Sequence, residues 1–317
     1  MRVPSAATAG MQWRKLVHRK TSEGVTVSEV APDLLLSLAV AAAHQLGYSC
    51  RVAAADDVML SGPAGDVMVG LTNLRRMAAD EPPDQWPALV ADYLSTGLVD
   101  LEVDSEPLDT GDFAMMQGLI RTRLYSGHGG APDVVRREVA PGLIQRVLID
   151  QVHTMAPVTY PMLRQWPIDE YELFALAQRN TRSDGALDVL THQIDTPSAD
   201  GVEITMLSGI SDYITAHACW LDAYPVIGPA GAVFVVPSQR HIYAHPVANL
   251  QVVQATTVLA QVAVLDYTQR PWPVSQDVYW WHGGTIELAA ATQHTGESLC
   301  IYPSEDFLTA LNELPEP

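Results

Sequence analysis

One segment of the sequence comes close to the pattern of a serine hydrolase. In such enzymes the nucleophile is the serine of G-x-S-x-G, at a sharp turn between a strand and a helix. Gly209 and Ser211 follow an apolar stretch, but Tyr213 occupies the position of the second glycine. Tyrosine cannot replace a glycine that permits close packing at this turn. We therefore interpret Ser211 as a helix N-cap, with a hydrolase site near Ser211 as the alternative.

Two residue pairs could be considered as metal ligands, one of two histidines and one of an aspartate and a histidine. His241 and His245 are four residues apart, which suits two ligands on a helix. Their segment has the pattern of a strand, however, and four residues of a strand span roughly 13 Å, too far for one ion. Asp212 and His217 are five residues apart, a poor helical match. We expect no metal site.

Cofactor and redox motifs are also missing from the sequence. A phosphate-binding loop needs GxxxxGK[ST], and the chain has only the lysines Lys15 and Lys20, neither of them in such a segment. Cys50, Cys219 and Cys300 are widely spaced, with no CxxC pair. We expect these cysteines to be isolated small hydrophobic residues, and we expect no cofactor and no catalytic residue.

Aromatic residues gather near the C-terminal end. Trp272, Tyr279, Trp280 and Trp281 lie within ten positions. Side chains alternate between the two faces of a strand, so Tyr279 and Trp281 would share one face and Trp280 would lie on the other. One face would then be core. The other is either core as well or a surface for a ligand or partner.

Local patterns indicate the elements that must position these residues. Short apolar runs between turn residues predict strands, and periodic apolar segments with acidic starts and glycine stops predict helices. The predicted helices are 32–46, 71–79, 84–94, 168–179, 211–220, 250–265 and 304–314, the last with Ser304 as N-cap. The predicted strands are 48–55, 58–60, 67–70, 113–125, 144–152, 187–194, 202–207, 231–236, 241–245, 278–281 and 285–288.

The order of these elements predicts an α+β fold. Strands and helices do not alternate as a doubly wound parallel sheet requires, so we expect mixed sheets with helices packed on them. An acidic, turn-rich stretch over 101–112 marks a boundary between two modules. We divide the chain into a flexible basic tail (1–20), an N-terminal α/β module (21–105) and a C-terminal α+β module (106–317).

The charge distribution limits the class of partner. The formal net charge is −19, although residues 1–20 contain five basic side chains and no acidic one. An acidic surface repels nucleic acid and anionic lipid. No apolar run is long enough to span a bilayer and no signal peptide is evident. We expect a soluble cytoplasmic protein with no nucleic acid or membrane insertion, whose partner, if any, is a basic protein.

Four stretches, in the same order, resemble the YtpQ-like family of bacterial proteins. They are Val69–Arg76, Met115–Tyr125, Trp166–Asn180 and Gly231–Trp281. The resemblance implies a fold and brings no catalytic residue or cofactor. Its matched stretches contain polar residues that we select as candidates together with Asp212 and the aromatic Trp280. The candidate binding residues are Arg121, Asn180, Asp212, Arg240, Asp277 and Trp280.

The sequence therefore favours a non-catalytic binding or regulatory protein. In this hypothesis an acidic surface engages a protein partner, in the way that an inhibitor binds a basic target. The hydrolase near Ser211 is one alternative. Another is a structural subunit that the basic tail, 1–20, tethers to a larger assembly.

Overall fold

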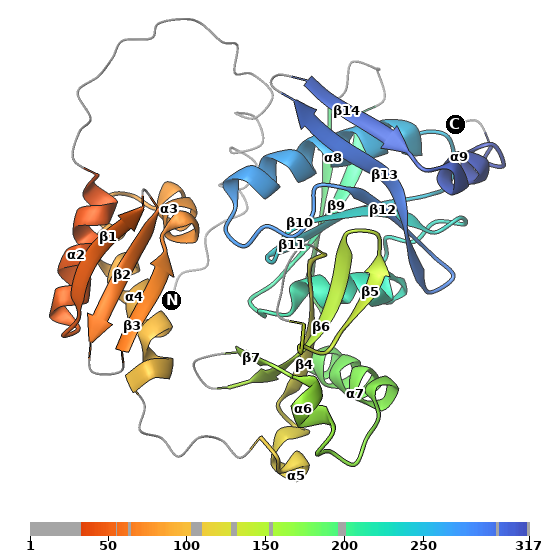
Figure 1. The fold of residues 1–317 in the computed structure, drawn as a ribbon. Coiled ribbons are helices and arrows are strands. Elements are labelled where there is room, and N and C mark those ends of the chain that lie inside the picture. The colour runs from red at the N-terminus through yellow and green to blue at the C-terminus, as the bar shows by residue number, and fades with distance from the viewer. Residues whose placement is uncertain are drawn as a thin grey trace, which may run out of the picture.

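The structure is a computed structural model, and it describes residues 33–54, 56–62, 65–102, 110–127, 132–151, 155–195, 201–295 and 298–315. These residues form three sheets with helices packed on them, which confirms the predicted α+β class (Figure 1). Every ladder between the described strands is antiparallel, whereas mixed sheets were expected. Short hairpin connections account for the pairs of consecutive strands, because parallel neighbours need long crossovers.

The N-terminal module is a three-stranded sheet covered by helices. Its strands β1 (Ser49–Ala54), β2 (Asp57–Gly62) and β3 (Gly65–Gly70) pair in that order. Its helices are α2 (Leu34–Gln45), α3 (Thr72–Ala79) and α4 (Trp86–Glu102). Gly47, which was expected to stop the first helix, has φ +85°, a backbone angle that glycine adopts without strain.

A second sheet, of four strands, follows, and we call it the small sheet because the third sheet has seven strands. Strand β6 (Leu143–Asp150) pairs with β4 (Ile120–Ser126) on one side and with β5 (Arg136–Ala140) and β7 (Met155–Pro157) on the other. Helices α6 (Tyr160–Leu163) and α7 (Glu170–Ser183) accompany this sheet, and α7 packs on it through Leu173 and Phe174.

The prediction of one strand over 113–125 is wrong in its first half. Phe113–Met116 forms a short helix, α5, and the strand begins only at Ile120. The cause is Asp112, whose carboxylate accepts hydrogen bonds from the main-chain N–H groups of Ala114 (2.9 Å) and Met115 (3.4 Å). Such a cap favours a helical turn over an extended chain.

The third sheet has seven strands. They are β8 (Asp188–Ile194), β9 (Val202–Ser208), β10 (Ala232–Ser238), β11 (His241–Pro246), β12 (Val278–His282), β13 (Thr285–Thr295) and β14 (Ser298–Pro303), in the order β14-β13-β12-β10-β11-β9-β8. Helix α8 (Val252–Gln269) packs on one face of this sheet, with α9 (Glu305–Leu311) beside it. Segment η1 (Ile214–Ala223) packs on the other face.

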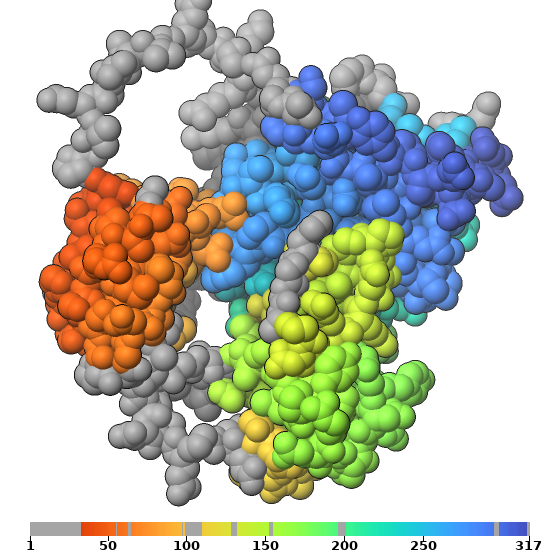
Figure 2. Space-filling model, in the orientation of Figure 1, coloured from red at the N-terminus to blue at the C-terminus, as the bar shows by residue number. Residues whose placement is uncertain are grey.

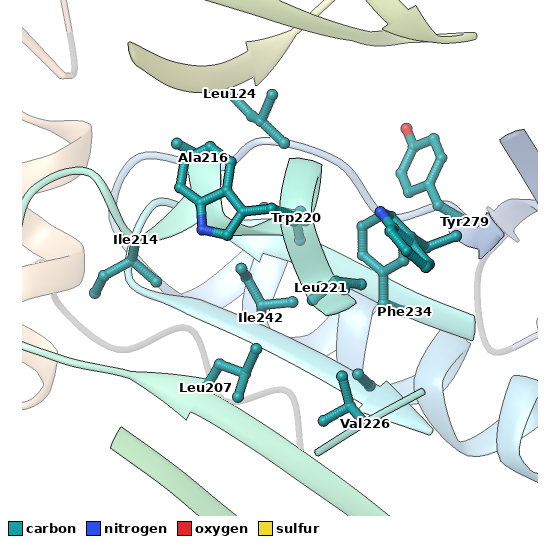
Figure 3. Close-up of a cluster of buried hydrophobic side chains, with 14 of the residues drawn as sticks. Leu124, Leu207, Ile214, Ala216, Trp220, Leu221, Val226, Phe234, Ile242 and Tyr279 are labelled. Atoms are coloured by element: carbon teal, nitrogen blue, oxygen red, sulfur yellow. The ribbon is translucent and has the colours of Figure 1, made fainter. Parts of the chain in front are cut away.

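The segment predicted as a helix over 211–220 is this η1, a 3-10 helix that starts later. Trp220 interrupts it with a non-helical backbone (φ −142°, ψ 53°). The Trp220 indole N–H donates to Nδ1 of the buried His217, 3.2 Å away. Figure 3 shows Trp220 and Leu221 between Leu124 of β4 and Leu207 of β9, so η1 fills the space between the small and large sheets.

The hydrophobic clusters of the two modules are separate. The N-terminal cluster contains only residues from Leu35 to Leu98, and the other clusters contain only residues from Phe113 onward. In Figure 2 the orange N-terminal module adjoins the blue end of α8. The predicted tail (1–20) and the predicted boundary at 105 lie outside the described residues. Within the described part, no helix is long and apolar enough to cross a membrane.

Candidate functional site

A pocket of about 130 Å³ lies where five segments of the chain meet. Strand β4, strand β7, the approach to η1, the β10–β11 turn and the segment after α8 each contribute to it. The residues that line the pocket are Arg123, Met155, Asp212, Gln239, Arg240 and Trp272.

Arg123 is a buried cation that forms no ion pair with a described carboxylate. Its side chain is only 8% exposed. Its Nη1 donates to the main-chain oxygen of Asp212 (3.1 Å) and approaches the sulfur of Met155 (3.6 Å), and its guanidinium lies over the Tyr125 ring. Within the described residues no carboxylate forms an ion pair with Arg123, and its Nε is buried without a hydrogen-bond partner. An uncompensated buried charge costs several kcal/mol.

Arg240 supplies a second cation to the pocket. Its guanidinium lies 5.6 Å from the centre of the Trp272 ring, within the range of a cation–π contact. Its Nη2 is 3.6 Å from a carboxylate oxygen of Asp212, but both side chains are well exposed (43% and 54%). An exposed ion pair of this length is weak. The carboxylate of Asp212 therefore compensates Arg240 only in part.

The small sheet adds to the positive field around Arg123. Arg123 is directly opposite Arg146 on β6, and Arg146 is directly opposite Arg136 on β5, so these three residues form an arginine row on one face of the sheet. Burial lowers the pKa of Arg146, and the charge of Arg136 lowers it further. Like charges at opposite positions of a ladder are unfavourable, and an anion nearby would relieve this repulsion.

Trp272 closes the pocket with a strained backbone. Its φ is +53°, although it lies between Pro271 and Pro273 and carries a large side chain. The residue before a proline favours an extended conformation, so this angle is costly. The main-chain N–H of Trp272 donates to Oδ1 of Asn73 (3.0 Å), and its carbonyl accepts from the N–H of Gln239 (3.1 Å). The N-terminal module thus helps to hold this wall.

Two of the six candidate residues from the sequence line this pocket, and a third, Arg121, lies on the strand that supplies Arg123. Asp212 and Arg240 line the pocket. Arg121 lies on the same face of β4 as Arg123, where it makes a two-bond ion pair with Asp184 (2.7 and 2.9 Å). Asp184 therefore neutralises Arg121, and Arg123 remains the uncompensated charge.

The other three candidates lie elsewhere. Asn180 joins α7 to β4, because its amide donates to the carbonyls of Gln117 (2.8 Å) and Ile120 (2.9 Å). Asp277 accepts the main-chain N–H of Thr292 (2.8 Å). Trp280 is buried, and its indole N–H donates to the carbonyl of Ala230 (2.8 Å). All three have structural partners in the described chain.

The aromatic faces follow the predicted alternation. Tyr279 and Trp281 pack in the cluster around η1, and Trp280 packs in the cluster under α8. Both faces are therefore core, and the aromatic group that does line a pocket is Trp272. The sequence contained one signal for Arg123: the arginines at 121 and 123 are two positions apart and so share a face of one strand.

Segment η1 begins at Ile214 with Tyr213 as its N-cap residue, so the prediction of a helix N-cap at Ser211 is wrong. The Ser211 hydroxyl accepts the main-chain N–H of Tyr213 (3.1 Å), and no described histidine is hydrogen-bonded to it. The residue at the start of η1 is Tyr213, without a side-chain cap. The buried His217 is instead bonded to the Tyr224 hydroxyl (2.5 Å), and burial lowers its pKa to about 4.

The described residues include no group of three or more histidine, cysteine, aspartate or glutamate side chains that could hold a metal ion. Comparison of the chain with family models, curated proteins and solved structures finds no match. The resemblance to the YtpQ-like family therefore stays a prediction. The chemistry of the site follows from its own residues, two cations and an indole face around a small cavity.

Proposed function

We propose that this chain is a binding protein whose pocket holds the anionic group of a small molecule. The supporting observation is the buried guanidinium of Arg123, which has no carboxylate partner in the described chain and an unbonded Nε. A phosphate or carboxylate oxygen would supply both the missing charge and a charge-assisted hydrogen bond. Arg240, on the exposed side of the pocket, would be the second contact.

The size of the pocket limits what enters it. A volume of about 130 Å³ equals roughly four water molecules at ~30 Å³ each. This space accommodates one phosphate or carboxylate group, and the rest of the ligand would lie outside. The indole of Trp272 lines the pocket and offers an apolar surface that the remainder of the ligand can contact.

Binding without catalysis fits the residues that line the pocket. Its one carboxylate, Asp212, is more than half exposed and lies beside Arg240, and none of the lining residues is a histidine. The non-catalytic function that the sequence favoured stays a prediction. The charge of the proposed ligand differs from that of the partner in the sequence-based hypothesis. The sequence pointed to a basic partner, whereas the pocket favours an anion. The acidic surface and its protein partner stay a prediction.

Calorimetric titration of the full chain with inorganic phosphate, at low ionic strength, tests the proposal. The parent should bind phosphate, and Arg123→Gln should lose most of the affinity. The matched control is Arg51→Gln, because Arg51 is an exposed arginine on β1 in the other module. Circular dichroism of each variant checks folding, and Arg240→Gln gives a second test at an exposed residue. Equal binding by the parent and Arg123→Gln would refute the proposal.

A further inference from the structure

A larger cleft, of about 490 Å³, lies between the two modules. Helix α3 forms one wall and the C-terminal end of α8 forms the other, two elements that adjoin in Figure 1. Its volume is in the range of about 300–1,000 Å³ that small organic ligands occupy. The lining residues are Arg75, Arg76, Ala79, Asp80, Leu265, Asp266, Thr268, Gln269 and Arg270.

The α8 wall is a connected polar network. The Tyr243 hydroxyl donates to the carboxylate of Asp266 (2.7 Å), which is 9% exposed, and burial raises the pKa of Asp266. Arg270 lies 3.8 Å from the other oxygen of Asp266 and makes a 2.6 Å ion pair with Asp80 of the N-terminal module. Arg270 is thus shared between two carboxylates, one from each module.

Arg76 is the cation of the cleft that lacks a carboxylate. Its Nη1 donates to the main-chain oxygen of Arg270 (3.1 Å), and within the described residues it has no ion pair. Its neighbour Arg75 is different, because Asp33 and Asp56 both pair with it. A guanidinium carries five N–H donors, so Arg76 retains donors for an anion.

The two modules meet across this cleft through polar contacts. Arg76 to Arg270, Asp80 to Arg270 and Asn73 to Trp272 join modules that share no hydrophobic cluster. Interfaces of this kind permit relative movement of domains. A ligand that contacts both walls would favour the docked arrangement by its binding free energy.

We infer that the α3–α8 cleft is a second binding site, for a small organic molecule with a phosphate or carboxylate group that pairs with Arg76. Leu265 and Ala79 contribute apolar surface for its body, and the exposed amide of Gln269 is available for hydrogen bonds. None of the residues that line this cleft lines the Arg123 pocket. Its ligand holds the two modules together.

Titration of the full chain with citrate and with inorganic pyrophosphate, at low ionic strength, tests this inference. The parent should show two binding events, and small-angle scattering should show a smaller radius of gyration when the cleft is filled. Arg76→Gln should lower the affinity of one event by about tenfold, as expected for one charge-assisted contact, and should abolish the compaction. Arg123→Gln should remove the other event and leave the compaction.

Asp80→Asn provides a variant whose effect has the opposite sign. It frees Arg270 from its closest carboxylate, so anion affinity in the cleft should rise several-fold. A purely structural Asp80 would give no such rise. The control is again Arg51→Gln. The inference is wrong if neither probe binds the parent at millimolar concentration, if Arg76→Gln binds and compacts like the parent, or if Asp80→Asn does not bind more tightly. If the parent shows the cleft event but no event that depends on Arg123, only the proposed function is contradicted.

Discussion

The main-chain N–H of Trp272 donates a hydrogen bond to the side-chain oxygen of Asn73, 3.0 Å away and in the other module. Trp272 has an unfavourable backbone angle and lines the pocket of Arg123 and Arg240. Strained residues persist where their surroundings hold them. Asn73 is thus a positioning residue for one wall of the pocket, and the placement of the N-terminal module is linked to anion binding.

Replacement of Asn73 by alanine tests this link. Loss of the hydrogen bond should cost about 1 kcal/mol, and the relaxed Trp272 should weaken phosphate binding several-fold without unfolding either module. Calorimetric titration measures the affinity. Asn312→Ala, at an exposed asparagine after α9, is the control. If both variants bind phosphate like the parent, Asn73 has no influence on the pocket.

Arg123→Met should separate binding from stability. Methionine keeps most of the packing and removes a buried charge that lacks a partner. In anion-free buffer the free energy of unfolding should therefore stay equal or rise, by about 1 kcal/mol, while phosphate no longer raises the melting temperature. Urea denaturation with and without phosphate measures both effects. A loss of about 3 kcal/mol, typical of a broken buried pair, would instead assign Arg123 a structural role.

Features of the fold that depend on neighbours in sequence were predictable. Ser304 was expected as an N-cap, and its hydroxyl accepts the N–H of Phe307 (3.2 Å). The alternation of Tyr279, Trp280 and Trp281 followed from strand geometry alone. The wrong prediction of a strand at Phe113 also has a local cause. The apolar pattern after Phe113 suits a strand or a helix, and the Asp112 cap favours the helix.

The pocket could be predicted only in part, because its parts meet through the tertiary fold. Arg240 and Asp212 were selected as isolated polar residues, but nothing in the sequence placed them beside Arg123. The arginine row depends on the register of three strands, and the amino-acid sequence alone does not reveal that register. The net charge of −19 describes the whole chain and does not show where these arginines gather.

The stability of the C-terminal module should fall as the pH drops from about 6.5 to about 4. Burial, together with the charge of Arg182, lowers the pKa of His217 from 6.5 to about 4. Between these values the unfolded chain binds more protons, so the contribution is full above 6.5 and is lost toward 4. The loss approaches about 3 kcal/mol. Measurements of unfolding free energy against pH would show it.

His217→Asn gives the matching variant. The asparagine oxygen can accept from the Tyr224 hydroxyl and the Trp220 indole, as Nδ1 of His217 does, but it does not titrate. The pH dependence should therefore become shallower. His241, whose pKa burial also lowers to about 4, should provide part of the remaining slope. The exposed His294→Asn should leave the slope as in the parent, and an unchanged slope for His217→Asn would contradict the assignment.

Leu74→Ala should destabilise one module and spare the other. Leu74 is fully buried in a cluster that contains only N-terminal residues, and such a truncation costs about 2–5 kcal/mol. Because the modules share no apolar cluster, little of this cost should reach the large sheet. Hydrogen exchange should show lost protection in α2–α4 and unchanged protection in β10–β12. Leu221→Ala, in the cluster around η1, should give the reverse pattern. Equal loss of protection in both modules, for either variant, would mean that they unfold as one cooperative unit.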